Sequence, residues 1–497
     1  MLHCHVIGKR CSTNRTRHDV AALGTQLVCR DAVIGSPNAA PETTNTYKRD
    51  TVLTTVPPPP SEPKPQDPTT HAILSLSVVI RVISITDMYG RHEPIDVVII
   101  GGGIAGCYAA YRLRQQHASL RVLVIEAGDR LGGRAQTDVF HGVPVTTGAG
   151  LGRFGKDNLL TRLMTQLKFP VNVFTTGHKV LAIDDLSCHV ETDFKTLRQH
   201  YVDQRERLSA PLHVTFKDFA SKRLPDYDGF VACTGFSDFE HADAADVFFR
   251  YGFEDNYSLW PAFAVPWSTL VAAMMRGVPH VLDTRVSALR RTRNHTYVVT
   301  CVDVGDDTTW QIHVPKVIIA TDVSAVQALL PTCSHLYKHI HGQPFIKIYG
   351  IFDARSAEIL ATILPKTGLI VFPGSPLQKI VHIRDAVYMI AYSDNAKAVA
   401  LRSLSLNDNK SRRDLAKLVE AAVRLPVHSL RLLDTRTYFW RIGTHYYDPF
   451  ATRAGRSKTQ FVEAAQRPMP GVFVAGECVA LRQGWVEGAL QSVENIL

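Results

Sequence analysis

Short apolar runs alternate with glycine-rich and polar stretches from residue 97 onward, and their lengths predict the main elements. Val97–Ile100 and Val122–Ile125 are four-residue runs rich in branched side chains, as expected of buried parallel strands. Between them lies Gly101–Gly106, which reads Gly-Gly-Gly-Ile-Ala-Gly and opens a helical stretch through Leu113. A strand, a glycine-rich turn, a helix and a second strand predict one unit of a parallel α/β sheet.

The same patterns predict elements further along the chain. Helical periodicity is present at residues 158–167 and 194–208, and a helix is expected at 266–275. Strands are expected at 142–145, 281–289, 297–304, 311–314, 316–320, 344–352 and 471–475. From about 170 to 260 the pattern mixes helix and loop, and it contains no recognisable catalytic constellation.

The first turn has the spacing Gly-x-Gly-x-x-Gly, formed by Gly101, Gly103 and Gly106. Glycine permits the tight turn and the close approach of a pyrophosphate, and the helix that follows presents unpaired N–H groups and the positive end of its dipole. Glu126 ends the second strand about 20 residues later, where a carboxylate can accept hydrogen bonds from both ribose hydroxyls. The pattern predicts a dinucleotide site but does not distinguish NAD from FAD.

The next residues make that distinction. Residues 126–134, Glu-Ala-Gly-Asp-Arg-Leu-Gly-Gly-Arg, resemble the flavin-containing amine oxidase family, in which the acid is followed by Arg-x-Gly-Gly-Arg. The last arginine of that family motif helps to hold the FAD pyrophosphate, and Arg134 matches it; a bidentate guanidinium suits two linked phosphates. The resemblance covers about residues 95–497 and implies FAD as the cofactor, with further contacts from Ile104, Ala105 and Ala127.

Residues after the strand expected at 142–145 resemble the family's Gly-Ala element, which lines the cofactor near its reactive ring. Gly148 and Ala149 match this element. Some relatives that oxidise amino acids have an arginine just after it that binds the substrate carboxylate, a role that the resemblance suggests for Arg153. The glycine spacing is longer here than in the family, so a structural role for Arg153 is the alternative. The family also implies that the backbone of Val286 contacts the adenine.

A lysine lies among apolar residues in the strand expected at 344–352. Lys347 shares one face of that strand with Phe345 and Tyr349, and a lysine buried without a partner is costly. The resemblance implies that Lys347 is the active-site lysine, which hydrogen-bonds through a water to flavin N5. The alternative is a lysine whose ammonium group reaches solvent from the edge of a sheet.

Two aromatic motifs near the carboxyl end also match the family. Trp440 matches its tryptophan near the flavin, and Tyr446 or Tyr447 matches the aromatic beside the ring, with Tyr446 preferred. No cysteine lies between Trp440 and Tyr447, so FAD is expected to be bound non-covalently. Trp485 corresponds to a second aromatic that would enclose the amine together with Tyr446. Core packing is the alternative for both rings.

The closing motif contributes the remaining cofactor contacts. Gly476 and Glu477 match the family's Gly-Glu pair, and Glu477 falls where the family contacts the ribityl-phosphate region of FAD. Glu487 and Ala489 lie at the start of the last expected helix, whose positive dipole end is implied to face the flavin pyrimidine.

The resemblance implies an α/β fold class, with a discontinuous Rossmann-like FAD-binding domain and an inserted α+β substrate domain. The FAD-binding domain is expected at 94–165, 263–330 and 433–497, and the substrate domain at 166–262 and 331–432. Residues 1–93 contain the proline run Pro57–Pro60 and are expected to form a disordered extension. The working protein is expected to begin near Met88, and a transit peptide is the alternative for the tail.

Composition limits the partners. The 497 residues are 45% hydrophobic and 20% charged, and a formal charge of +9 is modest, so no nucleic-acid partner is expected. The apolar stretch 72–85 contains Arg81 and is too short to cross a bilayer. The nine cysteines are scattered without a metal-type Cys-x-x-Cys pair, so no metal site is expected, and buried free thiols in a reducing, intracellular compartment are the simplest interpretation. The sequence does not determine the oligomeric state.

The implied reaction is oxidation of a C–N bond. Hydride passes from the carbon bearing a neutral amine to flavin N5, the imine hydrolyses, and oxygen is reduced to hydrogen peroxide. The substrate is expected to be a small amine or amino acid, and monoamine, polyamine and amino acid substrates all remain open. Two alternatives also remain, namely a flavin-dependent desaturase or porphyrinogen-type oxidase, and a catalytically degenerate FAD-binding interaction protein.

Overall fold

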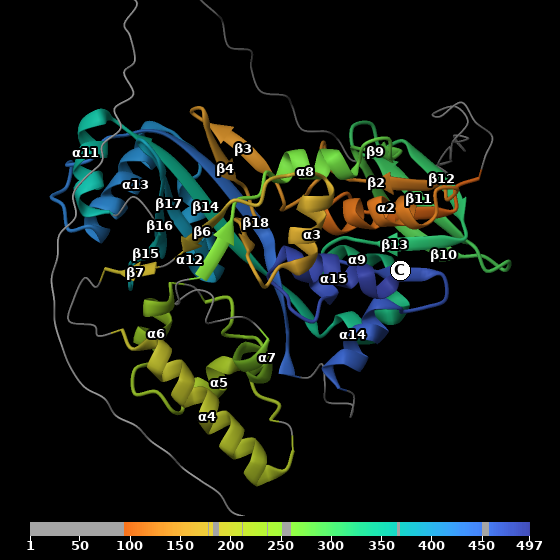
Figure 1. The fold of residues 1–497 in the computed structure, drawn as a ribbon, viewed down its shortest axis with the longest axis horizontal. Coiled ribbons are helices and arrows are strands. Elements are labelled where there is room, and N and C mark those ends of the chain that lie inside the picture. Colours follow the sequence, from red (N-terminus) through yellow and green to blue (C-terminus); the bar gives the residue numbers. More distant parts are fainter. Residues whose placement is uncertain are drawn as a thin grey trace, which may run out of the picture. The chain divides into compact units, whose positions relative to one another are not determined.

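The computed structural model of the chain describes most residues after 93 (Figure 1). The described ranges are 94–176, 178–181, 188–210, 212–235, 237–250, 260–364, 368–449 and 457–497. All of them belong to one structural unit, Ser77–Leu497. The expectations of a disordered extension at 1–93 and of a start near Met88 lie outside the described residues.

A five-stranded parallel sheet forms around the first glycine-rich turn. Its strand order is β19–β13–β1–β2–β9. The strands are β1 (Val97–Ile100), β2 (Val122–Ile125), β9 (His280–Val281), β13 (Lys316–Ile319) and β19 (Val472–Val474). Every residue of β1 is buried, as its uninterrupted apolar run predicts. The expected α/β class with a Rossmann-like sheet is confirmed.

Alternate residues of the central strand enter two separate cores. Ile99 packs with the helices on one face of the sheet, and Val98 packs with the elements on the other face. The first face is covered by α2 (Ile104–Gln116), α3 (Asn158–Gln166), α8 (Trp267–Met274) and α15 (Val486–Ile496). The second is covered by β10 (Thr284–Arg291), β11 (Tyr297–Asp303), β12 (Thr309–Val314), α9 (Val323–Leu329), η2 (Pro331–Cys333), α10 (Ser334–Tyr337) and α14 (Lys458–Gln466).

The single strand expected at 281–289 is wrong, because two strands occupy this stretch. β9 ends at Val281 in the parallel sheet, and β10 begins at Thr284 in an antiparallel sheet of order β10–β11–β12. Between them Asp283 has a φ of +49°, in the left-handed region, which redirects the chain from one sheet to the other.

A second large sheet lies beside the first and has six strands in the order β18–β14–β17–β16–β15–β7. These are β7 (His178–Val180), β14 (Ile340–Phe352), β15 (Leu369–Val371), β16 (Lys379–Arg384), β17 (Val387–Asp394) and β18 (Leu432–Tyr447). The strand expected at 344–352 is part of the longer β14. The predicted domain boundary between 432 and 433 falls at the first residue of β18.

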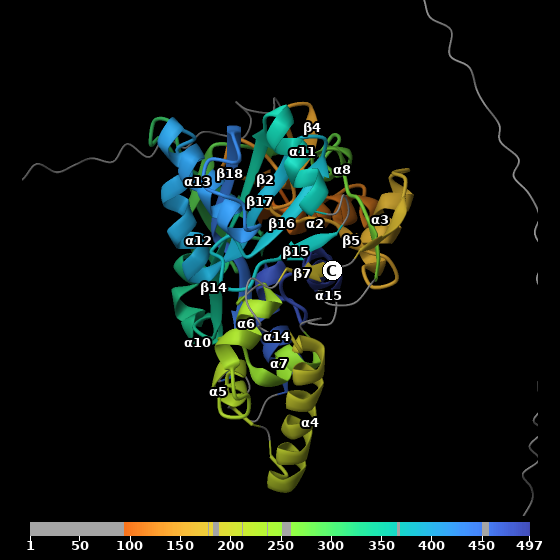
Figure 2. The same ribbon diagram turned by 90° about the vertical axis from the view of Figure 1, so that its left-hand side faces the viewer.

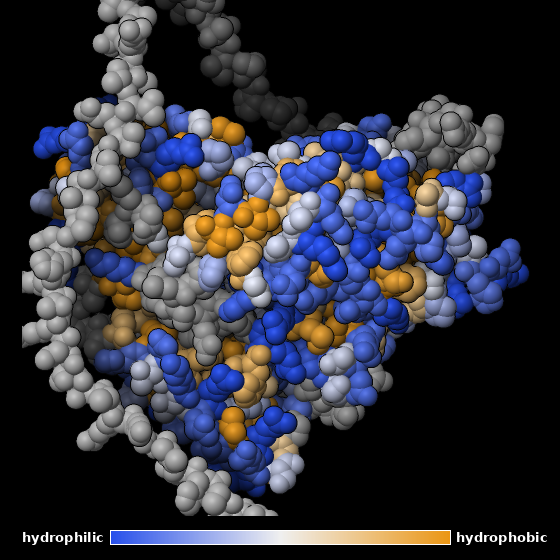
Figure 3. All heavy atoms as spheres, in the orientation of Figure 1, coloured by the Kyte–Doolittle hydropathy of each residue, from blue (hydrophilic) through white to orange (hydrophobic). Residues whose placement is uncertain are grey.

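Short elements complete this part of the fold. The helices α11 (Ala354–Ile363), α12 (Asn395–Leu401) and α13 (Asn409–Ala422), with η3 (Arg402–Leu404), pack against the six-stranded sheet. Two small sheets contain β3 (Thr137–Phe140) with β4 (Val143–Thr146), and β5 (Gly152–Arg153) with β8 (Trp260–Phe263) and β6 (Val173–Thr176). In Figure 3 hydrophilic side chains predominate over α2 on this face.

Four helices form a separate cluster below the sheets in Figures 1 and 2, which we call the helical unit (residues 188–250). They are α4 (Val190–Leu208), α5 (Phe216–Ala220), α6 (Tyr227–Thr234) and α7 (Ala244–Phe249). Their core is aromatic, with Phe216 in ring contact with Phe194, Phe230, Phe239 and Phe248. No other described part of the chain has so aromatic a core.

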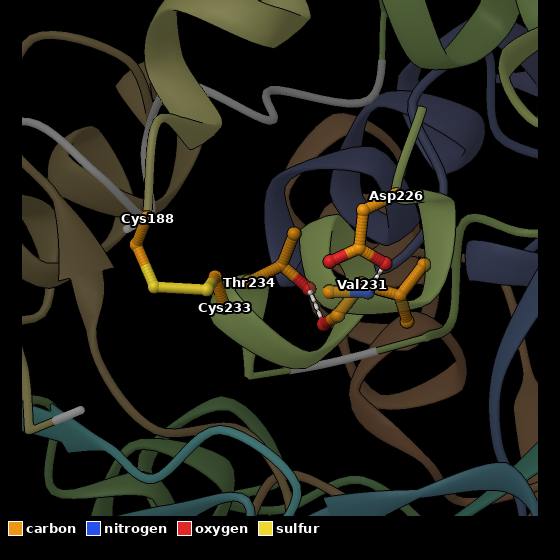
Figure 4. Close-up of a disulfide and its surroundings, with 6 residues drawn as sticks. Cys188, Asp226, Val231, Cys233 and Thr234 are labelled. Atoms are coloured by element: carbon orange, nitrogen blue, oxygen red, sulfur yellow. Dashed lines mark hydrogen bonds between the residues drawn. A yellow bond between two sulfur atoms is a disulfide. The ribbon is translucent and has the colours of Figure 1, made fainter. Parts of the chain in front are cut away.

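A disulfide joins Cys188 to Cys233 in the helical unit (Figure 4). The expectation of free thiols throughout is therefore wrong for this pair, because packing of α6 beside the start of α4 brings together two cysteines that are 45 residues apart. Within the described ranges, four cysteines are free and buried, namely Cys107, Cys301, Cys333 and Cys478. Burial raises the pKa of the Cys107, Cys301 and Cys478 thiols to about 12, which makes them poor nucleophiles.

Candidate functional site

The first glycine-rich turn leaves room beside the start of α2. A Cβ on Gly106 would lie 2.0 Å from the carbonyl oxygen of Gly101, so helix and strand approach too closely there for any side chain. A Cβ on Gly103 would meet no protein atom within 4 Å. Gly103 is the N-cap of a 13-residue helix, so this open space faces unpaired backbone N–H groups. The space and its donors fit a pyrophosphate.

Glu126 connects the two glycine-rich turns. Its carboxylate accepts hydrogen bonds from the backbone N–H of Gly102 at 2.6 Å and of Gly128 at 2.8 Å. The side chain therefore fixes the first glycine-rich turn against the end of β2. Its contact with a ribose stays a prediction, for which the half-buried carboxylate has lone pairs to spare.

Arg134 and Glu477, which are 343 positions apart, form an ion pair at 3.0 Å. The Arg134 guanidinium also donates to the carbonyl oxygen of Gly443 at 2.7 Å. Glu477 further accepts from the backbone N–H of Gly484 at 2.7 Å and from Nδ1 of His445 at 2.6 Å. Burial opposes ionisation of Glu477, but His445, Arg134 and these hydrogen bonds favour it and hold its pKa well below the usual range.

Sequence reasoning missed His445. Its side chain is fully buried, and Nε2 accepts from the backbone N–H of Val323 at 3.3 Å while Nδ1 faces Glu477. Both ring nitrogens of His445 are therefore engaged by the protein. No local motif marks it; only the alternation along β18, which turns His445 inward and Tyr446 outward, could have identified it.

Lys347 and Trp440 meet at one loop. Lys347 Nζ donates to Gly148 O at 2.7 Å and to Thr146 Oγ1 at 3.0 Å. Trp440 Nε1 donates to Thr147 O at 2.9 Å. The structure therefore brings together Lys347, Trp440 and the Gly-Ala element, which come from three distant parts of the chain.

The burial of Lys347 contradicts the alternative of a lysine that reaches solvent from a sheet edge. β14 lies between β18 and β17, and Lys347 is only 2% exposed. Burial, assisted by the charge of Lys379, lowers the pKa of Lys347 to about 7. Lys347 is thus a buried amine that changes its charge near neutral pH.

Arg153 is committed to an ion pair. It is 5% exposed and contacts Asp157 Oδ1 with Nη2 at 2.6 Å and with Nε at 3.0 Å. Its guanidinium also lies over the ring of Trp485, 3.7 Å from the centroid. The structure therefore gives Arg153 the structural role that the sequence left as the alternative, and binding of a substrate carboxylate stays a prediction.

The two predicted cage aromatics have different neighbours. Tyr446 stacks on His341 at 5.2 Å between ring centroids and packs against the helical unit. It lines a small cavity of about 30 Å³ that also includes Asp238, Asp246 and Gln483. Trp485 instead lies under Arg153. Enclosure of an amine by Tyr446 and Trp485 together stays a prediction.

Glu487 binds another helix. Its carboxylate accepts from the backbone N–H groups of Leu159 and Leu160, each at 3.0 Å, at the start of α3. Because the Glu487 side chain is engaged, the predicted cofactor contact at the start of α15 is left to backbone groups. Ala489 is buried there. Gly476 precedes Glu477 with a φ of +131°, which favours glycine.

The remaining predicted cofactor contacts lie around the parallel sheet. Ile104 and Ala105 form the first turn of α2, and Ala127 is exposed directly after Glu126. Val286 lies in β10, which is the edge of its sheet, so one row of its backbone groups faces away from β11. Backbone recognition of a ring at Val286 stays a prediction that this edge position allows.

Sequence reasoning also missed three residues beside Lys347. They are the half-buried Tyr392, the buried Lys379, and Thr147, whose buried Oγ1 has no hydrogen-bond partner. The alternation of β17 could have placed Tyr392 beside Lys347, but nothing in the sequence pairs these strands. Among the described residues, no group of three or more His, Cys, Asp or Glu is arranged to hold a metal ion. Within the same residues, the helices are too short or too polar to cross a membrane.

Comparison with known proteins identifies the family. A model of the flavin containing amine oxidoreductases matches residues 104–494. Polyamine oxidase 2 of Arabidopsis thaliana is 39% identical over 99 residues, 20% of each chain, and Polyamine oxidase 3 of Oryza sativa subsp. japonica is 36% identical over 105 residues, 21% of each chain. The chain thus spans about a fifth of the length of these curated relatives.

A solved structure of putrescine oxidase bound to putrescine shares the fold. It has a TM-score of 0.63 and 17% identity over 81% of this chain and 98% of that chain. The family match begins at Ile104, within the first glycine-rich turn, and includes the Arg134 motif, the Lys347 strand and the closing Gly-Glu motif. The chain therefore belongs to the family of flavin-containing amine oxidoreductases.

Proposed function

We propose that this protein is an FAD-dependent oxidase that oxidises the C–N bond of a small amine. The proposal rests chiefly on Lys347, a buried amine whose hydrogen bonds go to neutral acceptors beside the Gly-Ala element. A purely structural role explains such a lysine poorly, because a methionine would fill the site without the cost of burying an amine. Membership of an amine-oxidising family supports the same conclusion.

The residues around the parallel sheet fit FAD. The open space at Gly103 would take the pyrophosphate, Arg134 would contribute a guanidinium beside it, and Glu126 would face the adenosine ribose. Thr147 Oγ1, which has no hydrogen-bond partner in its buried position, would face the flavin end. When bound, FAD supplies the redox chemistry by taking up hydride from the carbon that bears the amine and passing the electrons to oxygen, which yields hydrogen peroxide.

The chain's own contribution is to position groups and protons. Above about pH 7 Lys347 is a neutral amine, so it donates two N–H groups and keeps a lone pair with which to hold a water. Trp440 is tied to the same loop through Thr147 O, and its ring shields that side of the loop from water. The pair Arg134–Glu477 joins the second glycine-rich turn to the closing Gly-Glu motif, so two segments proposed to bind the cofactor are fixed to each other.

A di- or polyamine is the preferred substrate class. The curated relatives are named polyamine oxidases, and the neighbouring structure is of a putrescine oxidase. An amino acid is less well supported, because Arg153, its predicted carboxylate ligand, is already neutralised by Asp157. The geometry of the site also admits a monoamine, so monoamines are included in the same experiment.

The test is the absorption spectrum of purified protein during anaerobic addition of monoamines, polyamines and L-amino acids. Bleaching of the flavin bands by polyamines, with recovery and peroxide formation in air, is the expected result. Bound flavin that no amine bleaches would instead favour the desaturase or the non-enzymatic alternative. Bleaching by L-amino acids alone would restore the carboxylate role of Arg153.

Lys347→Met tests the lysine itself. Reduction or reoxidation of the flavin should slow at least tenfold, which is about 1.4 kcal/mol, while the protein becomes no less stable. Lys458→Met is a matched control, because Lys458 is as buried but forms an ion pair with Asp246. That control should lose stability and keep the rate. An unchanged rate in Lys347→Met would remove the lysine from the mechanism.

A further inference from the structure

A row of polar and aromatic side chains crosses the six-stranded sheet through Lys347. Tyr438 of β18, Lys347 of β14 and Tyr392 of β17 are direct cross-strand partners. Lys379 of β16 lies on the far side of this row, and its Nζ is 4.0 Å from the centroid of the Tyr392 ring. Lys347 Nζ is 5.1 Å from the same centroid. Two buried lysines therefore share one aromatic ring.

We propose that Lys379 is a positioning residue for Lys347, because its positive charge at the shared Tyr392 ring keeps Lys347 in the neutral amine form. The inference rests on the proposed position of Lys347 beside the flavin. It assigns a role to a buried charge that the proposed reaction does not otherwise use.

In the described part of the chain, the groups that face Lys347 are uncharged except for Lys379. Gly148 O and Thr146 Oγ1 accept its hydrogen bonds, and Tyr392 and Tyr438 flank it on the neighbouring strands. Tyr349, two positions away on β14, is engaged with Thr146 O. The Asp138 carboxylate stands behind Tyr438, whose hydroxyl donates to it. Burial first, and the like charge of Lys379 second, lower the pKa of Lys347.

Lys379 itself is surrounded differently. Burial first, and Lys397 to a smaller extent, lower the pKa of Lys379 overall, and the carboxylates of Asp394 and Asp238 partly offset this by favouring the charged form. Asp394 is held in place by the helical unit, since Ser237 donates to it from its backbone N–H at 2.9 Å and from its hydroxyl at 2.6 Å. The Tyr392 ring adds a cation–π contact.

The groups that neighbour the two lysines therefore favour different forms, charged for Lys379 and neutral for Lys347. The acidic neighbours of Lys379 favour its charged form. The repulsion between the two lysines therefore acts mainly on Lys347, whose neighbours are neutral. A neutral Lys347 donates its two N–H groups to the loop and presents a lone pair, which an ammonium group lacks. The helical unit thus influences Lys347 through Ser237, Asp394 and Lys379.

The experiment is a pH titration of the visible absorption of bound, oxidised flavin from pH 6 to 10, without any amine. Wild type should show an inflection near pH 7, and Lys347→Met should lack it. Lys379→Met and Lys379→Gln should move the inflection upward by about one pH unit, a tenfold change in proton affinity. Lys379→Arg keeps the charge and should restore the wild-type value.

Lys397→Met is the matched control, since it removes a lysine near Asp394 that is not at the Tyr392 ring. Its inflection should stay at the wild-type pH. An unchanged inflection in either neutral Lys379 variant that binds FAD overturns the inference, as does a wild-type inflection that persists in Lys347→Met. Because no substrate is added, these outcomes are independent of whether any amine bleaches the flavin.

Discussion

The parallel-sheet unit around Gly101–Gly106 and the helical unit at 188–250 are built on different principles. In the first, backbone approaches backbone, so that a Cβ on Gly106 has no room. In the second, the phenylalanine rings around Phe216 form the core, and one disulfide joins α6 to the start of α4. The first unit contains the predicted cofactor contacts, and the second sets the walls and charges beside Tyr446 and Lys379.

This difference explains why a motif could be recognised in the sequence of only one of these regions. Close backbone approach permits glycine alone, so the requirement is visible at fixed spacing. An aromatic core accepts many combinations of residues of similar volume, so it leaves no motif. If the two units are independent, changes in the helical unit should alter stability and changes in the parallel-sheet unit should alter cofactor binding.

Removal of the disulfide should have the largest effect, confined to the helical unit. Cys188→Ala with Cys233→Ala frees a loop of 45 residues in the unfolded chain, and such a loss costs about 2–4 kcal/mol. Urea unfolding should show the loss, and proteolysis should cut between 188 and 250, while FAD content stays at the wild-type value. Dithiothreitol should reproduce the effect in wild type and change nothing in the variant. A parallel loss of FAD would show that the two units are not separable.

Gly103→Ala should affect the parallel-sheet unit in the opposite way. Its φ of −68° suits alanine and its Cβ meets no protein atom, so the stability of the FAD-free protein should change by less than about 0.5 kcal/mol. FAD affinity should fall at least tenfold, because the methyl group occupies the space proposed for the pyrophosphate. FAD titration monitored by fluorescence measures it. Gly305→Ala, in the exposed β11–β12 turn, is the control, and equal affinity in both variants would place the pyrophosphate elsewhere.

Asp243→Asn should have the smallest effect and one that depends on pH. Burial, with the nearby charge of Asp246, raises the pKa of Asp243 to about 7, so the folded protein binds this proton more tightly than the unfolded chain does. Stability should therefore fall as pH rises from 5 to 7, by less than about 1.4 kcal/mol per pH unit. Urea unfolding at these pH values should show a flatter profile in Asp243→Asn. Asp226→Asn, at the N-cap of α6, should keep the wild-type slope.

The sequence correctly predicted the elements whose neighbours are close in the chain. The strands at 97–100 and 122–125 and the helix that begins after Gly103 are where their patterns place them. The prediction of a single strand at 281–289 was wrong because the chain changes direction at Asp283. The backbone of Asp283 is left-handed, and the pattern of apolar residues does not reveal this. Burial of Lys347 was foreseen from the apolar residues around it, but its acceptors in the 146–148 loop were not.

By itself the sequence determined the first glycine-rich turn, the acid after β2, the Arg134 motif and the family, because the spacing of these residues over a short stretch fixes the local backbone. Tertiary structure alone decided the partners of buried charges. Arg153 forms an ion pair with Asp157, and His445 hydrogen-bonds to Glu477. Lys379 lies over the ring of Tyr392. A buried charge must be satisfied by whichever groups packing brings within about 3 to 4 Å, and those groups come from segments that no local spacing relates.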